Sequence, residues 1–305
     1  MNFQDYTKLF MNYCETRKNL NAKTLKAYRI DLNQYAEFSH DSMSKTAICD
    51  YIAVIHKKYK AKTVRRKIAV LKAFTHYLFI DGYIEQNPFE SINVSLRLPI
   101  MLPRTIPLNT INHILQTAYR NISLANTKYQ NKMILRDIAV LEMLFVTGAR
   151  VSEVCNLKVD GFDLVTHTVK IFGKGSKERI IQIENSDVLK VMSEYYREFE
   201  QDIKRSRYIF INKLHMPLKE QSVREIINKY VRLSGYDDMK ITPHMFRHSF
   251  ATALLEEDVD IRYIQRILGH SSITTTQIYT QVSVSKQREI LSQKHPRNKM
   301  KISLF

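Results

Sequence analysis

Six side chains between residues 150 and 279 have the types needed to break a phosphodiester bond. The transition state of that reaction spreads negative charge over the non-bridging oxygens, and two guanidinium groups match this geometry in bidentate fashion. A tyrosine oxygen can attack phosphorus and form a covalent phosphotyrosine, while a lysine or histidine protonates the departing sugar oxygen. With two arginines supplying charge, no metal ion is required. The candidates are Arg150, Lys174, His244, Arg247, His270 and Tyr279.

Arg150 lies in "TGARVSEV", just after a glycine that should end a helix. If a new helix begins here, Glu153 is three residues on and within reach of the guanidinium. A buried arginine needs a counter-charge, and Glu153 could supply it. Taken alone, the pair is more often an ordinary surface salt bridge.

Lys174 stands between two glycines in "FGKGSKERII", which reads as two strands joined by a tight turn. A cationic hairpin tip can reach into a DNA groove or toward a leaving oxygen. Lys177 is the nearby competitor for the same role, and Arg179 follows it as a candidate DNA contact. The alternative is a common solvated Gly-Lys-Gly turn.

His244 and Arg247 are three residues apart in "PHMFRHSFATALLEE", where Pro243 suits a helix start, so they share one helix face. His244 and His248 also have the i, i+4 spacing of zinc ligands. However, the helix lacks the adjacent glutamate of the zinc hydrolase pattern, and no third ligand is evident. We therefore expect no metal here.

His270 and Tyr279 bracket the stretch "HSSITTTQIY", which follows a helix that Gly269 should end. The Ser/Thr run between them can start another short helix. By local evidence alone, Tyr279 is more typical of a packed core residue than of a nucleophile. Its interpretation as a nucleophile depends on the distant arginines, lysine and histidines.

The charge of the chain points to a polyanionic partner. Forty-seven Lys and Arg against 30 Asp and Glu give a net charge of +17, with a pI near 9.6. The alternative is the lysine excess of many proteins from AT-rich organisms. Residues 51–80 hold basic residues and no acid, which predicts a phosphate-binding helix face. The basic residues are Lys57, Lys58, Lys60, Lys62, Arg65, Arg66, Lys67 and Lys72.

The elements that must position these groups fall into two domains. Prolines at 88, 99, 103 and 107 interrupt regular structure, so we predict a domain over 1–90, a linker over 91–106 and a second domain over 107–305. The first domain is predicted to be all-helical, with Thr24 capping one helix. Another helix should bury its apolar residues at helical spacing: Val64, Ile68, Leu71, Phe74 and Leu78.

The second domain is predicted to be mixed. A buried helix should end at Gly148, and the hairpin around Lys174 should follow it. Helical stretches are expected around 219–233, 244–257 and 260–269. The three cysteines, Cys14, Cys49 and Cys155, are scattered, which favours a reducing compartment over a disulfide framework. No secretory signal and no membrane-spanning run are expected.

The chain resembles the tyrosine recombinases of the phage-integrase and Xer type. The blocks that carry the resemblance are "TGARVSEVCNL", "GKGSKER", "HMFRHSFAT", "IQRILGHSSITTTQIYT" and "KHPR", which occur in the order and spacing of that family. They cover residues 107–297, while residues 1–90 resemble the helical core-binding (SAM-like) domain less specifically. The implied fold is mainly α with a small antiparallel β-sheet in the catalytic domain, forming a two-domain, C-shaped DNA clamp.

The resemblance also implies the role of each residue. Tyr279 matches the nucleophile and Lys174 the general acid, and Glu153 matches the acid that supports the first arginine. The other matches are the first catalytic arginine, the His-x-x-Arg pair and the second histidine: Arg150, His244, Arg247 and His270.

The implied reaction is site-specific DNA recombination through a 3′-phosphotyrosyl link and a Holliday junction, with no cofactor. The implied partners are two duplex DNA sites and a homotetramer in which residues 284–293 dock on a neighbouring protomer, with an accessory protein in some systems. A bacterial, cytoplasmic, nucleoid-associated protein is expected. Because helices start near residue 1, we expect no arm-binding domain of the lambda type. The alternatives are a catalytically silent DNA-binding protein and a type IB topoisomerase.

Overall fold

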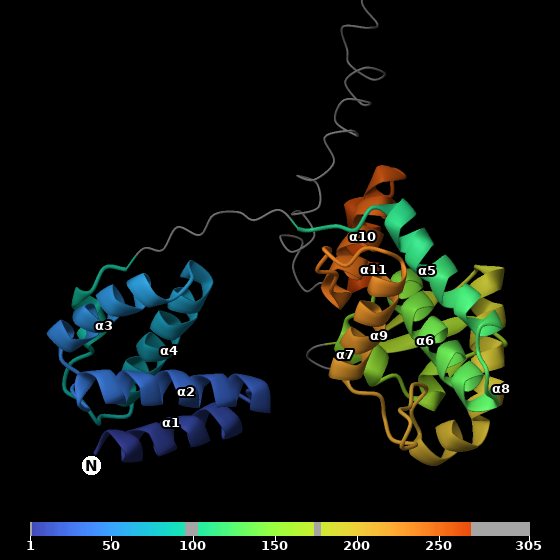
Figure 1. Cartoon of the computed structure of the whole chain (residues 1–305). Helices are drawn as coiled ribbons and strands as arrows, with labels where there is room; N and C mark the ends of the chain where they lie inside the picture. Colours follow the sequence, from blue (N-terminus) through green and yellow to red (C-terminus); the bar gives the residue numbers. More distant parts are fainter. Residues whose placement is uncertain (1, 95–102, 174–177, 270–305) are drawn as a thin grey trace, which may run out of the picture. The chain divides into compact units, whose positions relative to one another are not determined.

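The structure is a computed structural model that describes residues 2–94, 103–173 and 178–269. It divides into two compact units, Met1–Ile100 and Met101–Phe305, each with its own hydrophobic core. The described residues are mostly helical and contain one small antiparallel sheet, which confirms the predicted fold class (Figure 1). The predicted linker over 91–106 lies partly outside the described residues, and the predicted domain boundaries stay predictions.

The described part of the first unit is helical, as predicted. Apolar residues at i, i+3 and i+4 turn one face of each helix toward a shared core. The five residues predicted to be buried on α4, from Val64 to Leu78, are all buried. The elements are α1 (Phe3–Thr16), α2 (Ala22–Ser39), α3 (Lys45–Lys58), α4 (Ala61–Ile80) and the short 3₁₀ helix η1 (Pro88–Ser91).

Side-chain caps fix where these helices begin. Asn2 and Asp5 form a capping box on α1, and Ser44 caps α3. The prediction that Thr24 caps α2 is wrong: the helix begins at Ala22, and Asn21 is its cap. The Oδ1 of Asn21 accepts a hydrogen bond of 2.9 Å from the backbone N–H of Thr24, so Thr24 lies inside the first turn.

The second unit combines helices with the sheet, and it includes two long helices that the sequence analysis did not predict, α5 and α8 (Figure 1). Its elements are α5 (Leu108–Ser123), α6 (Lys128–Thr147), α7 (Val151–Cys155), η2 (Val159–Gly161), β1 (Phe162–Asp163), β2 (Thr168–Phe172), β3 (Glu178–Gln182), α8 (Ser186–Ser206), α9 (Glu220–Leu233), α10 (Pro243–Glu256) and α11 (Ile261–Leu268).

Helix α6 is the centre of the second unit. It packs against α5, α8 and α10, and its residues from Leu135 to Leu144 are buried except Arg136. A helix that is buried nearly all round is expected at the centre of a larger domain. The predicted end of this helix at Gly148 is confirmed, and so are the three predicted helical stretches, observed as α9, α10 and α11.

The predicted hairpin is confirmed as β2 and β3, which pair antiparallel with Ile171 opposite Arg179. The short strand β1 adds to the other edge of β2, so the strand order is β1-β2-β3. Alternate residues face the core, because successive side chains of a strand point to opposite faces: Val169, Ile171 and Ile181 are buried, whereas Ile180 is exposed.

The three cysteines are free, and two of them, Cys14 and Cys155, are buried. Burial raises the pKa of the Cys14 thiol to about 11 and that of Cys155 to about 12, so both stay protonated at neutral pH. Within the described ranges, no helix has both the length and the apolar character needed to cross a membrane.

Candidate active site

A glycine turn at the end of α6 begins the site. Gly148 has φ +55°, in the left-handed region that favours glycine. A Cβ added there would lie 2.4 Å from Cδ1 of Phe250, so the Phe250 ring would have to shift. Both the backbone conformation and the packing therefore favour glycine. Helix α7 begins three residues later, at Val151, and the Gly148 carbonyl oxygen is left available to α10.

Arg150 and Glu153 make the contact that the sequence predicts. Arg150 is the N-cap of α7, and its backbone N–H donates to Oε2 of Glu153 at 2.9 Å. Its Nη1 donates to Oε1 of the same carboxylate at 2.7 Å. The Glu153 side chain is 5% exposed, whereas the Arg150 side chain is 31% exposed. The carboxylate is therefore a buried anchor, and the guanidinium that it holds reaches solvent.

Arg179, which is predicted from the sequence as a DNA contact, has a side chain that points into the domain instead. Its side chain is 9% exposed, and its Nη2 lies 2.6 Å from Oε2 of Glu153. Its Nη1 is 3.3 Å from Oε1 of the same group, so the fork contacts both oxygens. The physical reason is strand register: Arg179 is two residues from the buried Ile181 and shares its face of β3.

The charge state of Glu153 follows from these contacts. Burial raises the pKa of the carboxyl, but the hydrogen bond from Arg179 and the bonds from Arg150 outweigh it, so the pKa is lowered overall. Glu153 is therefore ionised at neutral pH. One carboxylate holds two guanidinium groups in place.

Arg247 is held by backbone carbonyls from two other segments. The side chain is buried, its Nη1 donates to the Gly148 carbonyl oxygen at 2.9 Å, and its Nη2 donates to the Leu268 carbonyl oxygen at 2.7 Å. Leu268 is the last residue of α11. Arg247 on α10 thus joins the end of α6 to the end of α11.

His244 lies one turn before Arg247 on α10; the residue reaches solvent, although neighbouring groups partly desolvate its imidazole. Desolvation lowers the pKa of its imidazole, and the charges of Arg247, Arg150 and Arg224 act in the same direction, partly offset by Glu220. The imidazole is therefore neutral at pH 7 and able to accept a proton. The positive charges of both arginines therefore act on this imidazole.

His248, the residue considered as a zinc ligand, has its pKa lowered to about 4, by burial first and then by His244 and Arg247. Within the residues that the structure covers, no group of three or more His, Cys, Asp or Glu side chains could hold a metal ion.

The structure thus brings four predicted site residues to one place: Arg150, Glu153, His244 and Arg247. The remaining predicted groups lie outside the described residues: Lys174, Lys177, His270, Tyr279 and the segment 284–293. Gly269, the last described residue, caps α11 and directly precedes His270 in the sequence.

Two features of the site were not predicted from the sequence. The inward orientation of Arg179 could have been found from the alternation of Arg179, Ile181 and Ile183 along the strand. The two carbonyl oxygens that hold Arg247 had no sequence signal, because any residue type provides a backbone carbonyl.

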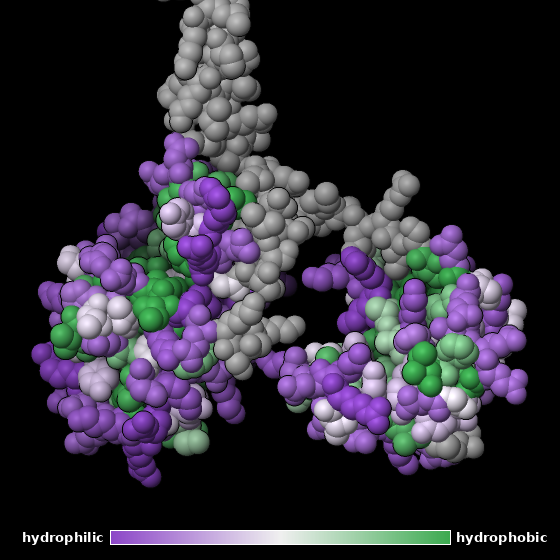
Figure 2. Space-filling view, turned by 180° about the vertical axis from the view of Figure 1, so that it is seen from behind, coloured by the Kyte–Doolittle hydropathy of each residue, from purple (hydrophilic) through white to green (hydrophobic). Residues whose placement is uncertain are grey.

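Most of the predicted cationic face of the first unit is exposed. Figure 2 shows hydrophilic side chains over much of the visible face of each unit, with hydrophobic ones in smaller groups between them. The exposed residues of the predicted face are Lys57, Lys58, Lys60, Lys62, Arg65, Arg66 and Lys72. Their exposure lets them meet phosphate groups, although Arg66 also contacts the carboxylate of Asp31, and a role in DNA binding stays a proposal.

Lys67 is a correction to this prediction, because its side chain is only 2% exposed. Its Nζ lies 2.9 Å from Oδ1 of the buried Asp31 on α2 and 5.0 Å from the centre of the Tyr59 ring. Arg66 contacts the same carboxylate. The reason is helical spacing: position 67 lies three residues after Val64 and four before Leu71, on the core face of α4.

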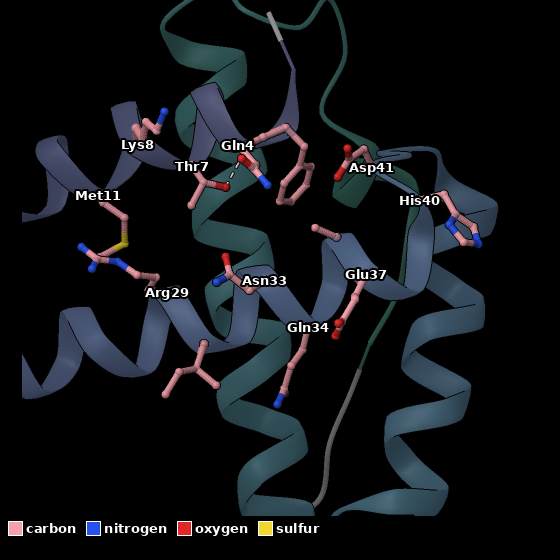
Figure 3. A pocket seen from close by; sticks show the side chains of 13 residues that line it. Gln4, Thr7, Lys8, Met11, Arg29, Asn33, Gln34, Glu37, His40 and Asp41 are labelled. Atoms are coloured by element: carbon pink, nitrogen blue, oxygen red, sulfur yellow. Dashed lines mark hydrogen bonds between the residues drawn. The ribbon is translucent and has the colours of Figure 1, made fainter.

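A groove of about 1140 Å³ lies between α1 and α2 in the first unit. Figure 3 shows side chains of both helices around it, including Lys8, Arg29 and Glu37. Cations, carboxylates and amides are mixed along this groove, and the hydroxyl of Thr7 donates to its own helix at the Phe3 carbonyl oxygen. The arrangement shows no group poised for chemistry.

The arrangement of the second unit favours binding of an anion. Arg150 and Arg179 share one carboxylate, Glu153, and Arg247 is held by backbone carbonyls, so these groups are net positive and Arg150 is the most exposed cation among them. Guanidinium groups held in fixed positions can stabilise charge on phosphate oxygens without reorganising during the reaction. A phosphodiester is the substrate class that such a cluster fits best.

Known proteins resemble the chain over nearly its whole length. The model of the phage integrase family matches residues 106–286, and that of the phage integrase N-terminal SAM-like domain matches residues 7–82. A "Tyrosine recombinase" of Agathobacter rectalis is 52% identical over 300 residues, covering 97% of this chain and 98% of that protein. "Tyrosine recombinase XerD" of Listeria innocua is 33% identical, covering 94% and 97% respectively.

A solved structure with a similar fold is that of the XerH site-specific recombinase bound to its palindromic difH substrate in a post-cleavage complex. It has a TM-score of 0.74 and 21% sequence identity, covering 94% of this chain and 84% of that chain.

Proposed function

The chain belongs to the phage integrase family and is a tyrosine recombinase, and we propose that it exchanges strands between two specific duplex sites through a covalent bond between Tyr279 and DNA. The arginine cluster is the observation that supports this most. Arg150 is fixed by a buried, ionised carboxylate and still reaches solvent. Arg247 is fixed by two carbonyl oxygens.

In the proposed reaction, Arg150 and Arg247 stabilise the negative charge that develops on the non-bridging oxygens of the scissile phosphate. The Tyr279 oxygen attacks phosphorus, its proton passes to a base, and the bond from phosphorus to the 5′ oxygen breaks. Lys174 protonates that departing oxygen. His244, neutral at pH 7, and His270 bind the phosphate or take a proton.

The products of cleavage are a 3′-phosphotyrosyl bond and a free 5′-hydroxyl. The bond energy is kept in the phosphotyrosine, so the 5′-hydroxyl of a partner strand can attack it and rejoin DNA without a nucleotide cofactor. Two such exchanges produce and then resolve a Holliday junction. The proposed assembly is a homotetramer on two duplexes, with residues 284–293 docked on a neighbouring protomer.

DNA binding is proposed to use both units, with the exposed cations of α3 and α4 on the phosphate backbone. A protein that acts on chromosomal or mobile-element DNA works where that DNA lies, which we propose is the bacterial cytoplasm. The proposal that the chain binds DNA is supported by its likeness in fold to the XerH complex, which holds a DNA substrate after cleavage.

The first experiment identifies the site and then traps the intermediate. Duplexes bound by the full chain are selected from a random pool, and the enriched site is rebuilt with a nick beside the cleaved phosphate. Cleavage then releases a short 5′-hydroxyl fragment, so rejoining is prevented and the covalent adduct accumulates. We expect an adduct from the native chain and none from Tyr279→Phe.

Tyr263→Phe is the matched control, because this tyrosine on α11 is 61% exposed and lies outside the proposed site. It should form the adduct at the native rate. An adduct formed by Tyr279→Phe would show that the nucleophile is wrong. Relaxation of supercoiled DNA that lacks any selected site would favour a type IB topoisomerase, and site binding with no adduct would favour a silent DNA-binding protein.

A further inference from the structure

Arg179 occupies a position where an apolar residue would ordinarily be expected. It is the second residue of β3 and shares one face of that strand with Ile181, which is 7% exposed. Its own side chain is 9% exposed. An arginine this buried carries a desolvation cost that only close partners offset. Its partners therefore indicate what it does.

The contacts of Arg179 join three segments. Its guanidinium contacts both oxygens of Glu153 on α7, at 2.6 Å and 3.3 Å. It also packs on Gly269 at the end of α11, where an added Cβ would lie 3.0 Å from its Nη1 and 3.2 Å from its Cδ. Gly269 has φ +66°, so the backbone there already favours glycine. The side chain fills the space beside that turn.

Stability alone does not account for this arginine. Its Nε is buried and has no hydrogen-bond partner among the described residues. A buried polar group without a partner ordinarily costs about 1–3 kcal/mol. A methionine would fill similar volume without that cost. The retained cation instead acts on Glu153, and it is the first of the groups that lower the pKa of that carboxyl against burial.

We propose that Arg179 is a positioning residue for DNA cleavage. It holds Glu153, Glu153 holds Arg150, and its contact with Gly269 sets the end of α11 against strand β3. Arg179 touches DNA in no step of this proposal. The inference rests on the proposed function, because its readout is the cleavage rate.

This role differs measurably from that of a DNA contact. A phosphate-binding arginine raises affinity for duplex DNA, and its loss reduces the slope of log K against log salt by about 0.9. A positioning residue leaves affinity and slope unchanged and alters only the rate of the chemical step. A small misplacement of a group at the reacting centre lowers the rate by about a hundredfold.

The experiment measures adduct formation on the nicked site duplex, with the protein in excess so that all DNA is bound. The variants are Arg179→Met, Arg179→Lys, Glu153→Gln and the double variant E153Q/R179M. Arg205→Met is the matched control, because this exposed arginine at the end of α8 gives the same change of net charge. Thermal melting checks that each variant is folded at the assay temperature.

We expect Arg179→Met to cleave about tenfold to a hundredfold more slowly than the native chain, with native affinity and salt slope. In the Glu153→Gln background the same substitution should cost no more than about twofold, because Arg179 acts through Glu153. Arg179→Lys keeps the charge without the fork, so its rate should fall between those of the native and Met variants. It also serves as the test if the Met variant does not fold.

Two outcomes would overturn the inference. One is a loss of affinity and salt slope in Arg179→Met with an unchanged rate at saturation, which would identify a DNA contact. The other is a double variant whose losses multiply, which would show that Arg179 acts independently of Glu153. Failure of the native chain to form any adduct would instead contradict the proposed function, so the two failures are distinguishable.

Discussion

Glu153 shows how one buried side chain can set the geometry of several others. It accepts from the Arg150 backbone, the Arg150 guanidinium and the Arg179 guanidinium. Its burial strengthens these contacts, because the effective dielectric constant is low there. The same burial makes the loss of the charge costly, since two arginines would keep their charges without a counter-ion. The residue therefore contributes to stability as well as to the site.

The pH dependence of that contribution has a definite sign. Folding lowers the pKa of Glu153 from its ordinary 4.5, so the stabilisation is complete above that pH and is lost as the pH falls through the lowered value. Glu153→Gln should reduce the free energy of unfolding by about 3 kcal/mol at pH 7. The difference from the native chain should shrink below pH 4.5. Urea unfolding across this range measures it.

Glu178→Gln is the matched control for this experiment. Glu178 pairs with Lys170 at 2.7 Å, but the two side chains are 46% and 41% exposed. An exposed pair of this kind contributes less than about 1 kcal/mol. A difference of the same size for both variants would contradict the special role of Glu153.

At the scale of elements, the site is built where helices end and begin. Arg150 caps α7, His244 is in the first turn of α10, and the ends of α6 and α11 supply the carbonyl oxygens that Arg247 binds. Helix ends suit this purpose, because their last carbonyl groups have no partner within the helix. Arg247 donates to two such carbonyl oxygens and so joins the end of α6 to the end of α11.

Gly148→Ala tests the turn between α6 and α7. The variant must adopt a left-handed backbone, and its methyl group must also displace Phe250. We expect a loss of more than about 2 kcal/mol in the free energy of unfolding, together with slower cleavage, because Arg150 and Arg247 both depend on this turn. Chemical unfolding and adduct formation measure the two effects.

Gly235→Ala separates the effect of the left-handed backbone from the effect of crowding by Phe250. This glycine also has positive φ, +76°, but an added Cβ would meet no atom within 4 Å. The control should lose only about 1 kcal/mol and should keep the native cleavage rate. Equal losses for the two variants would show that crowding by Phe250 is unimportant.

At the scale of the whole molecule, the net charge is +17, but some of the cations that contribute to it are buried. Seven of the eight cations predicted on one face are exposed, but Lys67 is buried against Asp31. Arg179 is the corresponding exception in the second unit. A count of charges therefore overstates how many cations can meet DNA.

The salt dependence of DNA binding distinguishes exposed cations, which can contact phosphate, from buried ones. Replacing Lys58, Lys62 and Arg65 with Gln should reduce the slope of log K against log salt by up to about 2.7, with little effect on stability, because all three are exposed. Lys67→Met should leave the slope unchanged and lower the free energy of unfolding by about 3 kcal/mol. Titrations of a short duplex at several salt concentrations measure the slope. A reduced slope for Lys67→Met would place this lysine on DNA.

Several elements were predictable because their patterns are long and regular. The buried stripe of α4, the end of α6 at Gly148 and the β2–β3 hairpin all follow from apolar spacing and glycine positions. Helix α8 was missed, although Val188, Tyr195 and Phe199 recur at helical spacing behind the Asn185 cap. The cap of α2 was misplaced, because Asn21 and Thr24 are both acceptable caps and only the observed contact distinguishes them.

The sequence by itself determined the fold class, the family and the short-range pair of Arg150 and Glu153, because each depends on residues close in the chain or on the order of motifs. Only the tertiary structure decided which cations are buried. Lys67 and Arg179 look like solvent-facing charges in a basic sequence, but Asp31 and Glu153, 36 and 26 residues away, bind them inside the cores. Burial of a long cationic side chain costs desolvation free energy. A carboxylate that folding brings next to the cation offsets this cost, so the side chain can lie in the interior.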